Sequence, residues 1–185
     1  MSRRSAGLLM FRRAPGASGA ARAGSRGLEV FLVHPGGPFA KHRDEPAWSL
    51  PKGEFDPAGN ESSLDVARRE FGEETGRAVE ACRRAGDTGD AKEFIPLGAV
   101  AQRGGKRVEA WAFEGDWPEG QPVVSNTFAI EWPPRSGKQQ EFPEVDDGAF
   151  FPLADARRRI LDAQAVFLDR LVAHLERGAG AAGGG

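Results

Sequence analysis

Short apolar runs and one longer helical period follow each other along this chain, and their order predicts a mixed α/β domain. Apolar runs of strand length lie at residues 6–12, 28–34, 94–102, 108–113, 127–132 and 149–151. The third and fourth runs are separated by a short glycine-containing turn, so they are expected to form a hairpin. Strands interspersed with helices in this way predict one mixed sheet flanked by helices.

Apolar residues at helical spacing up to about Thr75 predict the first helix of the domain. Asn60 or Ser62 can cap its start, because a short polar side chain can accept a hydrogen bond from the first turn. Gly76 is placed to end it in a left-handed conformation. The residues expected on its buried face are Leu64, Ala67, Phe71 and Thr75.

Polar or glycine-rich segments separate the other elements. Segments 14–27, 80–92 and 135–147 are expected to be loops, the second with a helical turn. Two helices are predicted near the end of the chain, at 153–160 and 163–177, and the last of them has a stripe at Val166, Phe167, Arg170, Leu171 and Leu175.

Length and composition describe an ordinary globular protein. The 185 residues are 39% hydrophobic and 28% charged, and we expect a single domain over 1–177 with a disordered Gly/Ala-rich tail at 178–185. A net charge of −2 argues against a nucleic-acid polymer as partner. Cys82 is the single cysteine, so neither an intrachain disulfide nor a cysteine metal site can form.

No apolar stretch approaches the ~20 residues that a membrane span requires. The basic start of the chain has an apolar run too short for a secretion signal. These features predict a cytoplasmic protein without a membrane partner. The oligomeric state is left open, with a homodimer among the options.

Four glutamates stand out against this background, because Glu61, Glu70, Glu73 and Glu74 fall within fourteen positions. On a helix the last three share one face, where like charges repel each other. A hard divalent cation would relieve this repulsion, since Mg²⁺ takes oxygen ligands and shares them with phosphates. The alternative is a solvated helix face with ion pairs to neighbouring arginines.

The spacing of these residues resembles the signature of Nudix hydrolases. Seven residues follow Glu61, and then come Arg69, Glu70, Phe71, Glu73, Glu74 and Gly76. Two departures are present: seven residues rather than five separate Gly53 from Glu61, and Arg77 stands where the signature has an apolar residue. The resemblance extends over about residues 5–175, through the Trp-Ser-Leu-Pro-Lys-Gly-Glu segment and the downstream Trp-Pro-Pro-Arg and Glu-Phe-Pro-Glu segments.

The resemblance implies an α/β/α sandwich with a mixed sheet and a loop-helix-loop catalytic motif. It also implies a phosphoanhydride hydrolase that acts on a nucleoside diphosphate-linked small molecule, dinucleoside polyphosphates included, with Mg²⁺ or Mn²⁺. Glu70, Glu73 and Glu74 would bind the metal, and Arg69 would orient a ligand carboxylate. Gly53 would let the backbone pass close to the metal site. Either Glu70 or an acid outside the helix would take the proton from the attacking water.

Residues outside the helix complete the candidate site. Glu141 and Glu144 are the two candidates for an additional catalytic carboxylate, and Glu144 is preferred because Phe142-Pro143 restricts its backbone. Lys52, Arg135 and Lys138 are candidates to bind phosphate, and Trp48 to stack on a base, although a tryptophan at such a position is commonly a core residue.

Two alternative functions remain open at this stage. The chain could hydrolyse nucleoside triphosphates or inositol polyphosphates instead of dinucleotides. It could also be a Nudix-like nucleotide-binding sensor without catalysis. The intact Glu70, Glu73 and Glu74 argue against a sensor.

Overall fold

The structure is a computed structural model of the chain, and it describes residues 3–14, 26–40, 45–83 and 94–182. Within these ranges, six strands form one sheet in the order β4–β5–β1–β2–β8, with β3 paired to β1 outside this path. β1 and β5 run parallel and the other neighbours are antiparallel, so the sheet is mixed, as predicted. The strands are β1 (Arg4–Arg13), β2 (Leu28–Pro35), β3 (Lys52–Phe55), β4 (Ile95–Ala101), β5 (Arg107–Glu114) and β8 (Val145–Pro152).

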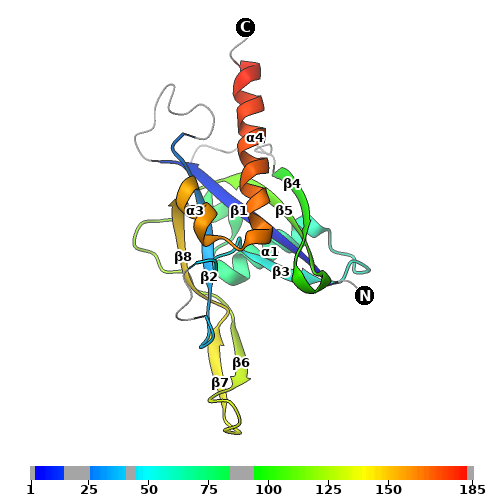
Figure 1. Cartoon of the computed structure of the whole chain (residues 1–185), viewed down its shortest axis with the longest axis vertical. Coiled ribbons are helices and arrows are strands. Elements are labelled where there is room, and N and C mark those ends of the chain that lie inside the picture. The colour runs from blue at the N-terminus through cyan, green and yellow to red at the C-terminus, as the bar shows by residue number, and fades with distance from the viewer. Residues whose placement is uncertain (1–2, 15–25, 41–44, 84–93, 183–185) are drawn as a thin grey trace.

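Helices cover both faces of this sheet (Figure 1). One apolar cluster joins the sheet to α1 and α2, with Phe31 and Phe71 among its buried residues. A second cluster joins the opposite face to α3 and α4 through Leu32 and Phe167. The expected α/β/α sandwich is therefore confirmed. Its helices are α1 (Ser63–Thr75), α2 (Val79–Cys82), α3 (Leu153–Arg159) and α4 (Ala165–Ala182), with single 3₁₀ turns η2 (Arg103–Gly105) and η3 (Asp162–Gln164).

β1 changes partner along its length, and this change opens the sheet. Its first residues, Arg4 to Gly7, pair with β3, whereas Phe11 to Arg13 pair with β2. The segment before β3 enters between the two, since the N–H of Leu8 donates to the carbonyl of Pro51 at 3.0 Å. Lys52 and Gly53 consequently lie where β1 and β2 diverge.

The ends of α1 follow the predicted capping. The Ser62 hydroxyl accepts a hydrogen bond from the N–H of Asp65 at 3.1 Å. Gly76 ends the helix with φ 77°, and its N–H donates to the carbonyl of Gly72. Val66 is fully buried with Ala67, Phe71 and Thr75, whereas Leu64 is only half-buried. The buried stripe is therefore rotated slightly from the expected one.

Segment 135–147 was expected to be a loop, but it contains a strand. β6 (Thr127–Glu131) and β7 (Gln139–Pro143) form a separate antiparallel hairpin that projects from the rest of the molecule (Figure 1). β7 reads Gln-Gln-Glu-Phe-Pro, which has no apolar alternation, because most of its side chains face solvent. Its pairing with β6 supplies the backbone hydrogen bonds that define the strand.

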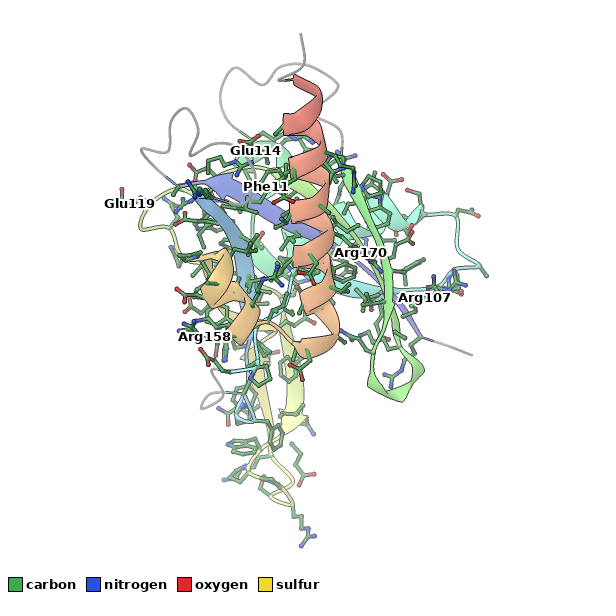
Figure 2. All side chains as sticks on the ribbon, turned by 45° about the horizontal axis from the view of Figure 1, so that its top comes forward. Phe11, Arg107, Glu114, Glu119, Arg158 and Arg170 are labelled. Carbon is green, nitrogen blue, oxygen red and sulfur yellow. The ribbon has the colours of Figure 1, made fainter. Side chains whose placement is uncertain are left out.

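The end of the chain also differs from expectation. α4 continues to Ala182, although residues from 178 onward were expected to be disordered. Its alanines favour helix more than the low-complexity composition suggested. Arg170, expected in the apolar stripe, is exposed and donates to the carbonyl of Leu97 at 2.6 Å, so it links α4 to β4 (Figure 2).

Two expected loops lie mostly beyond the described ranges. Of the segments 14–27 and 80–92, the structure describes only the ends, and the expected helical turn is α2. Among the described helices, none is both long and apolar enough to cross a membrane.

Candidate active site

α1 brings its glutamates against β3 at the point where the sheet opens. The N–H of Lys52 donates to Oε2 of Glu74 at 3.0 Å, which fixes that carboxylate against the strand. The Glu70 side chain is 13% exposed, whereas that of Glu73 is 38% exposed. Glu70 and Glu74 are therefore partly buried against β3, and Glu73 is the more exposed of the three acids.

Gly53 lies so close to Glu70 that any side chain at position 53 would displace the Glu70 carboxyl group. A Cβ placed on Gly53 would lie between 1.7 and 2.4 Å from the three atoms of the Glu70 carboxyl group. Backbone in contact with a carboxylate is a common reason for glycine. The two additional residues after Gly53 do not disturb this contact, because they enlarge an exposed turn in which Asp56 accepts hydrogen bonds from Ala58 and Gly59.

Arg69 connects the acidic side chains of α1. Its Nη1 donates to Glu70 at 2.8 Å and to Glu73 at 3.0 Å, and its Nε donates to Glu61 at 3.3 Å. The guanidinium group offers several donors in a fixed plane, so it can hold these carboxylates at once. Arg69 therefore contacts three of the four glutamates of the signature.

Burial raises the pKa of two of these acids. The pKa of Glu74 rises to about 7 because of desolvation, which Lys52 opposes and the charges of Glu70 and Glu144 reinforce. Desolvation also raises the pKa of Glu70, against the opposing effect of Arg69. Burial lowers the pKa of Lys52, and Glu74 is the strongest opposing charge. Carboxylates that are costly to ionise in this way are typical of functional sites.

Glu144 lies within electrostatic reach of this cluster, although it comes from another part of the chain, between β7 and β8 at the base of the hairpin. Its charge raises the pKa values of both Glu70 and Glu74. Two backbone hydrogen bonds connect Glu144 to α1 through Asn126. The N–H of Asn126 donates to the carbonyl of Glu73 at 3.1 Å, and the N–H of Glu144 donates to the carbonyl of Asn126 at 2.8 Å. The N–H of Gly36 donates to the carbonyl of Glu144 at 2.9 Å.

Glu141, the other candidate, is placed differently. It is exposed on β7 and pairs with Ala129 across the hairpin. The structure therefore brings Glu144, and not Glu141, to the acids of α1.

The candidate substrate-binding residues are distributed over distant parts of the molecule. Lys52 adjoins the acids, as described above. Arg135 and Lys138 are exposed in the turn that joins β6 to β7, at the far end of the projecting hairpin (Figure 1). Trp48 is 6% exposed and packs against Phe151 and His34 in the core. Its ring is thus a core element, which leaves no free face for stacking on a base.

One pair of residues near the acids was not suggested by the sequence. Nδ1 of His34 lies 2.7 Å from Oδ1 of Asp146, two positions after Glu144. The two residues are more than a hundred positions apart, and only the β2–β8 pairing brings them together. Local ligand spacing in the sequence does not reveal such a pair, because its members come from distant segments.

The donor set suits a hard divalent cation. Glu70, Glu73, Glu74 and Glu144 offer carboxylate oxygens, the ligands that Mg²⁺ and Mn²⁺ prefer. Burial makes Glu70 and Glu74 costly to ionise, and a bound cation would offset this cost. In the described parts of the chain, no three acidic, imidazole or thiol groups are already arranged around one point as ligands.

Comparison with known proteins agrees with this geometry. A sequence profile of the NUDIX domain matches residues 10–171. No curated protein matches the chain in sequence. The fold is similar to that of the C. elegans Ap4A hydrolase in a binary complex, with 20% identity and a TM-score of 0.57 over 92% of this chain and 97% of that one.

Two further solved structures have the same fold. The NUDIX domain of Shewanella oneidensis NrtR, complexed with ADP ribose, is 15% identical, with a TM-score of 0.57 over 95% of this chain and 89% of that one. A mutT/nudix family protein from Listeria innocua is 16% identical, with a TM-score of 0.56 over 95% of each chain. The profile match over most of the chain, with the acidic signature that α1 presents to β3, shows that this chain belongs to the Nudix hydrolase family and confirms the enzyme class predicted from its sequence.

Proposed function

We propose that this protein is a divalent-metal-dependent pyrophosphohydrolase that cleaves a phosphoanhydride bond in a nucleoside diphosphate-linked small molecule, dinucleoside polyphosphates included. The observation that carries the proposal is the contact of the α1 acids with β3, where Glu74 accepts a hydrogen bond from the N–H of Lys52 and the Glu70 carboxyl group lies against Gly53. Of the related structures, one is complexed with ADP ribose and another is named as an Ap4A hydrolase, and both compounds contain phosphoanhydride bonds, which supports this substrate class.

Glu70, Glu73 and Glu74 would hold Mg²⁺ or Mn²⁺. A bound divalent cation supplies charge neutralisation on the phosphate oxygens and lowers the pKa of a coordinated water. Arg69 would keep Glu70 and Glu73 oriented through the contacts described above. The N–H of Lys52 would do the same for Glu74.

The proton of the attacking water would pass to a carboxylate at this site. Glu70 and Glu144 are the two candidates, since both lie in the acidic cluster and Glu144 is not part of the helical signature. A general base must lie within hydrogen-bond reach of the water, directly or through one further water. The Lys52 ammonium, beside Glu74, would offer a positive charge to a phosphate oxygen.

Substitutions of Glu144 and Glu141 test which of the two is the additional catalytic carboxylate. We expect Glu144→Gln to reduce kcat roughly 10²-fold, because a positioned general base contributes at least that much. The matched variant Glu141→Gln should stay within about twofold of wild type, since it changes an exposed side chain away from the cluster. Steady-state kinetics on one nucleotide substrate measure both. Equal losses in the two variants would remove Glu144 from the site.

The stability of the metal-free protein should depend on pH through Glu74. Its pKa is raised from 4.5 to about 7 in the folded state, so folding favours the protonated form. The stability that this proton contributes is fully present below pH 4.5 and is lost as the pH rises through about 7. Because a cation needs the ionised carboxylate, Mg²⁺ should raise the melting temperature more at about pH 8 than at about pH 5.

Thermal unfolding with and without excess Mg²⁺ at both pH values measures this difference. In Glu74→Gln, which has no proton to lose at this position, the metal-dependent gain at the higher pH should shrink. An equal Mg²⁺ effect at the two pH values would contradict a metal site built on Glu74.

The proposed function is tested by incubating the purified chain with a panel of phosphoanhydrides. The panel contains nucleoside triphosphates, dinucleoside polyphosphates, nucleoside diphosphate sugars and inositol polyphosphates, with Mg²⁺ or with a chelator. We expect metal-dependent release of a nucleotide product from one of the nucleotide classes. Tight binding of one compound with no cleavage of any would identify a sensor and reject the enzyme.

A further inference from the structure

A cavity lies between the loop after β2 and the β6–β7 hairpin. It has a volume of about 480 Å³, within the range of ligand sites. It is lined on one side by the loop after β2 and on the other by the hairpin and the start of β8, with Gly37, Pro38, Trp132, Gln140, Phe142 and Asp146 as the main residues.

Aromatic rings form the hairpin side of this cavity. Trp132 and Phe142 meet edge to face, with ring centroids 6.5 Å apart. Phe39, which is 70% exposed, meets Trp132 at 5.3 Å and extends this wall. Such a group of partly exposed rings is unusual for a surface hairpin, since aromatic side chains gain most from burial.

The polar groups of the cavity suit a neutral heterocycle better than a phosphate. The Gln140 amide can both donate and accept hydrogen bonds, and Asp146 can accept them from an exocyclic amino group. No lysine or arginine is among the described residues that line this cavity. The negative charge of Asp146 would repel a phosphate group at this position.

The edge of the cavity is linked to Glu144 through the backbone. Pro143, at its edge, directly precedes Glu144, and the loop that forms its other wall holds the Glu144 carbonyl through the N–H of Gly36. A ligand with phosphates at Glu70, Glu74 and Glu144 would therefore have its remaining part beside Phe142 and Trp132.

We infer that this cavity is the subsite for a nucleobase of the substrate, which stacks on Trp132 and Phe142. The inference rests on the proposed function, because it takes the acidic cluster as the phosphate-binding part of the same site. It identifies the β6–β7 hairpin as the element that selects nucleotides over base-free polyphosphates.

A pair of non-hydrolysable ligands tests this inference. One is an ATP analogue in which methylene groups replace both anhydride oxygens, and the other is the corresponding triphosphonate without the nucleoside. Calorimetric titration with Mg²⁺ should show that Trp132→Ala weakens binding of the ATP analogue roughly tenfold or more, as loss of a base-stacking ring does. Binding of the triphosphonate should stay unchanged.

Two variants separate stacking from hairpin structure. Trp132→Phe keeps an aromatic ring and should restore most of the affinity. Ile130→Ala removes an apolar side chain from the same hairpin face, outside the cavity lining, and should bind both ligands like wild type. Circular dichroism checks that each variant is folded.

The outcomes decide between distinct possibilities. Unchanged binding of the ATP analogue by Trp132→Ala, or equal weakening of both ligands, would overturn the inference. If Trp132→Ala loses self-association but binds the ATP analogue with unchanged affinity, the inference would also be overturned, because the aromatic face would then be a surface between copies of this chain. Base-dependent binding through Trp132 in a protein that cleaves no nucleotide would reject the proposed function and leave this inference standing.

Discussion

Glu74→Gln should abolish turnover while leaving the fold intact. Residues that merely orient a metal ligand cost 10–100-fold when mutated, so loss of a ligand carboxylate should cost at least about 10²-fold in kcat. The fold should survive, because the glutamine oxygen can still accept the hydrogen bond from the N–H of Lys52. The variant also lacks a buried carboxylate that is costly to ionise, so it should be no less stable than metal-free wild type near neutral pH.

The measurement is kcat with saturating Mg²⁺, beside thermal unfolding of the same preparation. Glu176→Gln is the matched control, since it makes the same chemical change at an exposed position on α4. Activity like that of wild type in Glu74→Gln would show that α1 does not form the metal site.

Gly53→Ala should be the most damaging single-methyl change at the site. The added Cβ would overlap the Glu70 carboxyl group, with its nearest atom at 1.7 Å, so either Glu70 or β3 must move. A misplacement of about 1 Å in a catalytic group can cost roughly 10²-fold in rate. We expect a loss of that size in kcat.

Gly72→Ala provides the control for this change, because Gly72 lies on α1 beside the same acids. Its added Cβ would come no closer than 3.7 Å to a neighbouring atom, the carbonyl oxygen of Arg77. Alanine favours helix over glycine by about 1 kcal/mol, so this variant should be active and slightly more stable. If Gly53→Ala retains full activity, then the close contact between β3 and Glu70 has no role in catalysis.

The sequence predicts α1 accurately because each of its features is local. Ser62 caps the helix, Gly76 ends it, and the acids between them follow a fixed spacing on one helix. The same holds for the strands with continuous apolar runs, such as β1 and β2, which are buried on both faces. Local patterns of this kind do not depend on which other segments approach them.

The parts that were not predicted depend on contacts between distant segments. β7 is polar, and only its pairing with β6 reveals it as a strand. Trp48 was a candidate for base stacking, but the packing of Phe151 and His34 around it places it in the core. The proximity of Glu144 to Glu70 likewise follows from the backbone hydrogen bonds that join α1, Asn126 and β8, which no local spacing encodes.

The segment from Gly53 to Glu61 was predicted only in part. Two more residues separate Gly53 from Glu61 than in the family signature, and this longer spacing does not define where β3 lies against α1. The structure accommodates them in the exposed turn at Asp56 and keeps the contact between Gly53 and Glu70.

Hydrolysis in ¹⁸O-labelled water, followed by mass spectrometry of the products, tests the central claim most directly. With Mg²⁺ and a cleaved nucleotide substrate, we expect one labelled oxygen in one of the two phosphate-containing products, and none with chelator or with Glu74→Gln. The labelled product identifies the phosphorus that water attacks, and hence the bond that is broken. Unlabelled, uncleaved nucleotides throughout the panel would contradict the assignment of this site as a metal-dependent pyrophosphohydrolase.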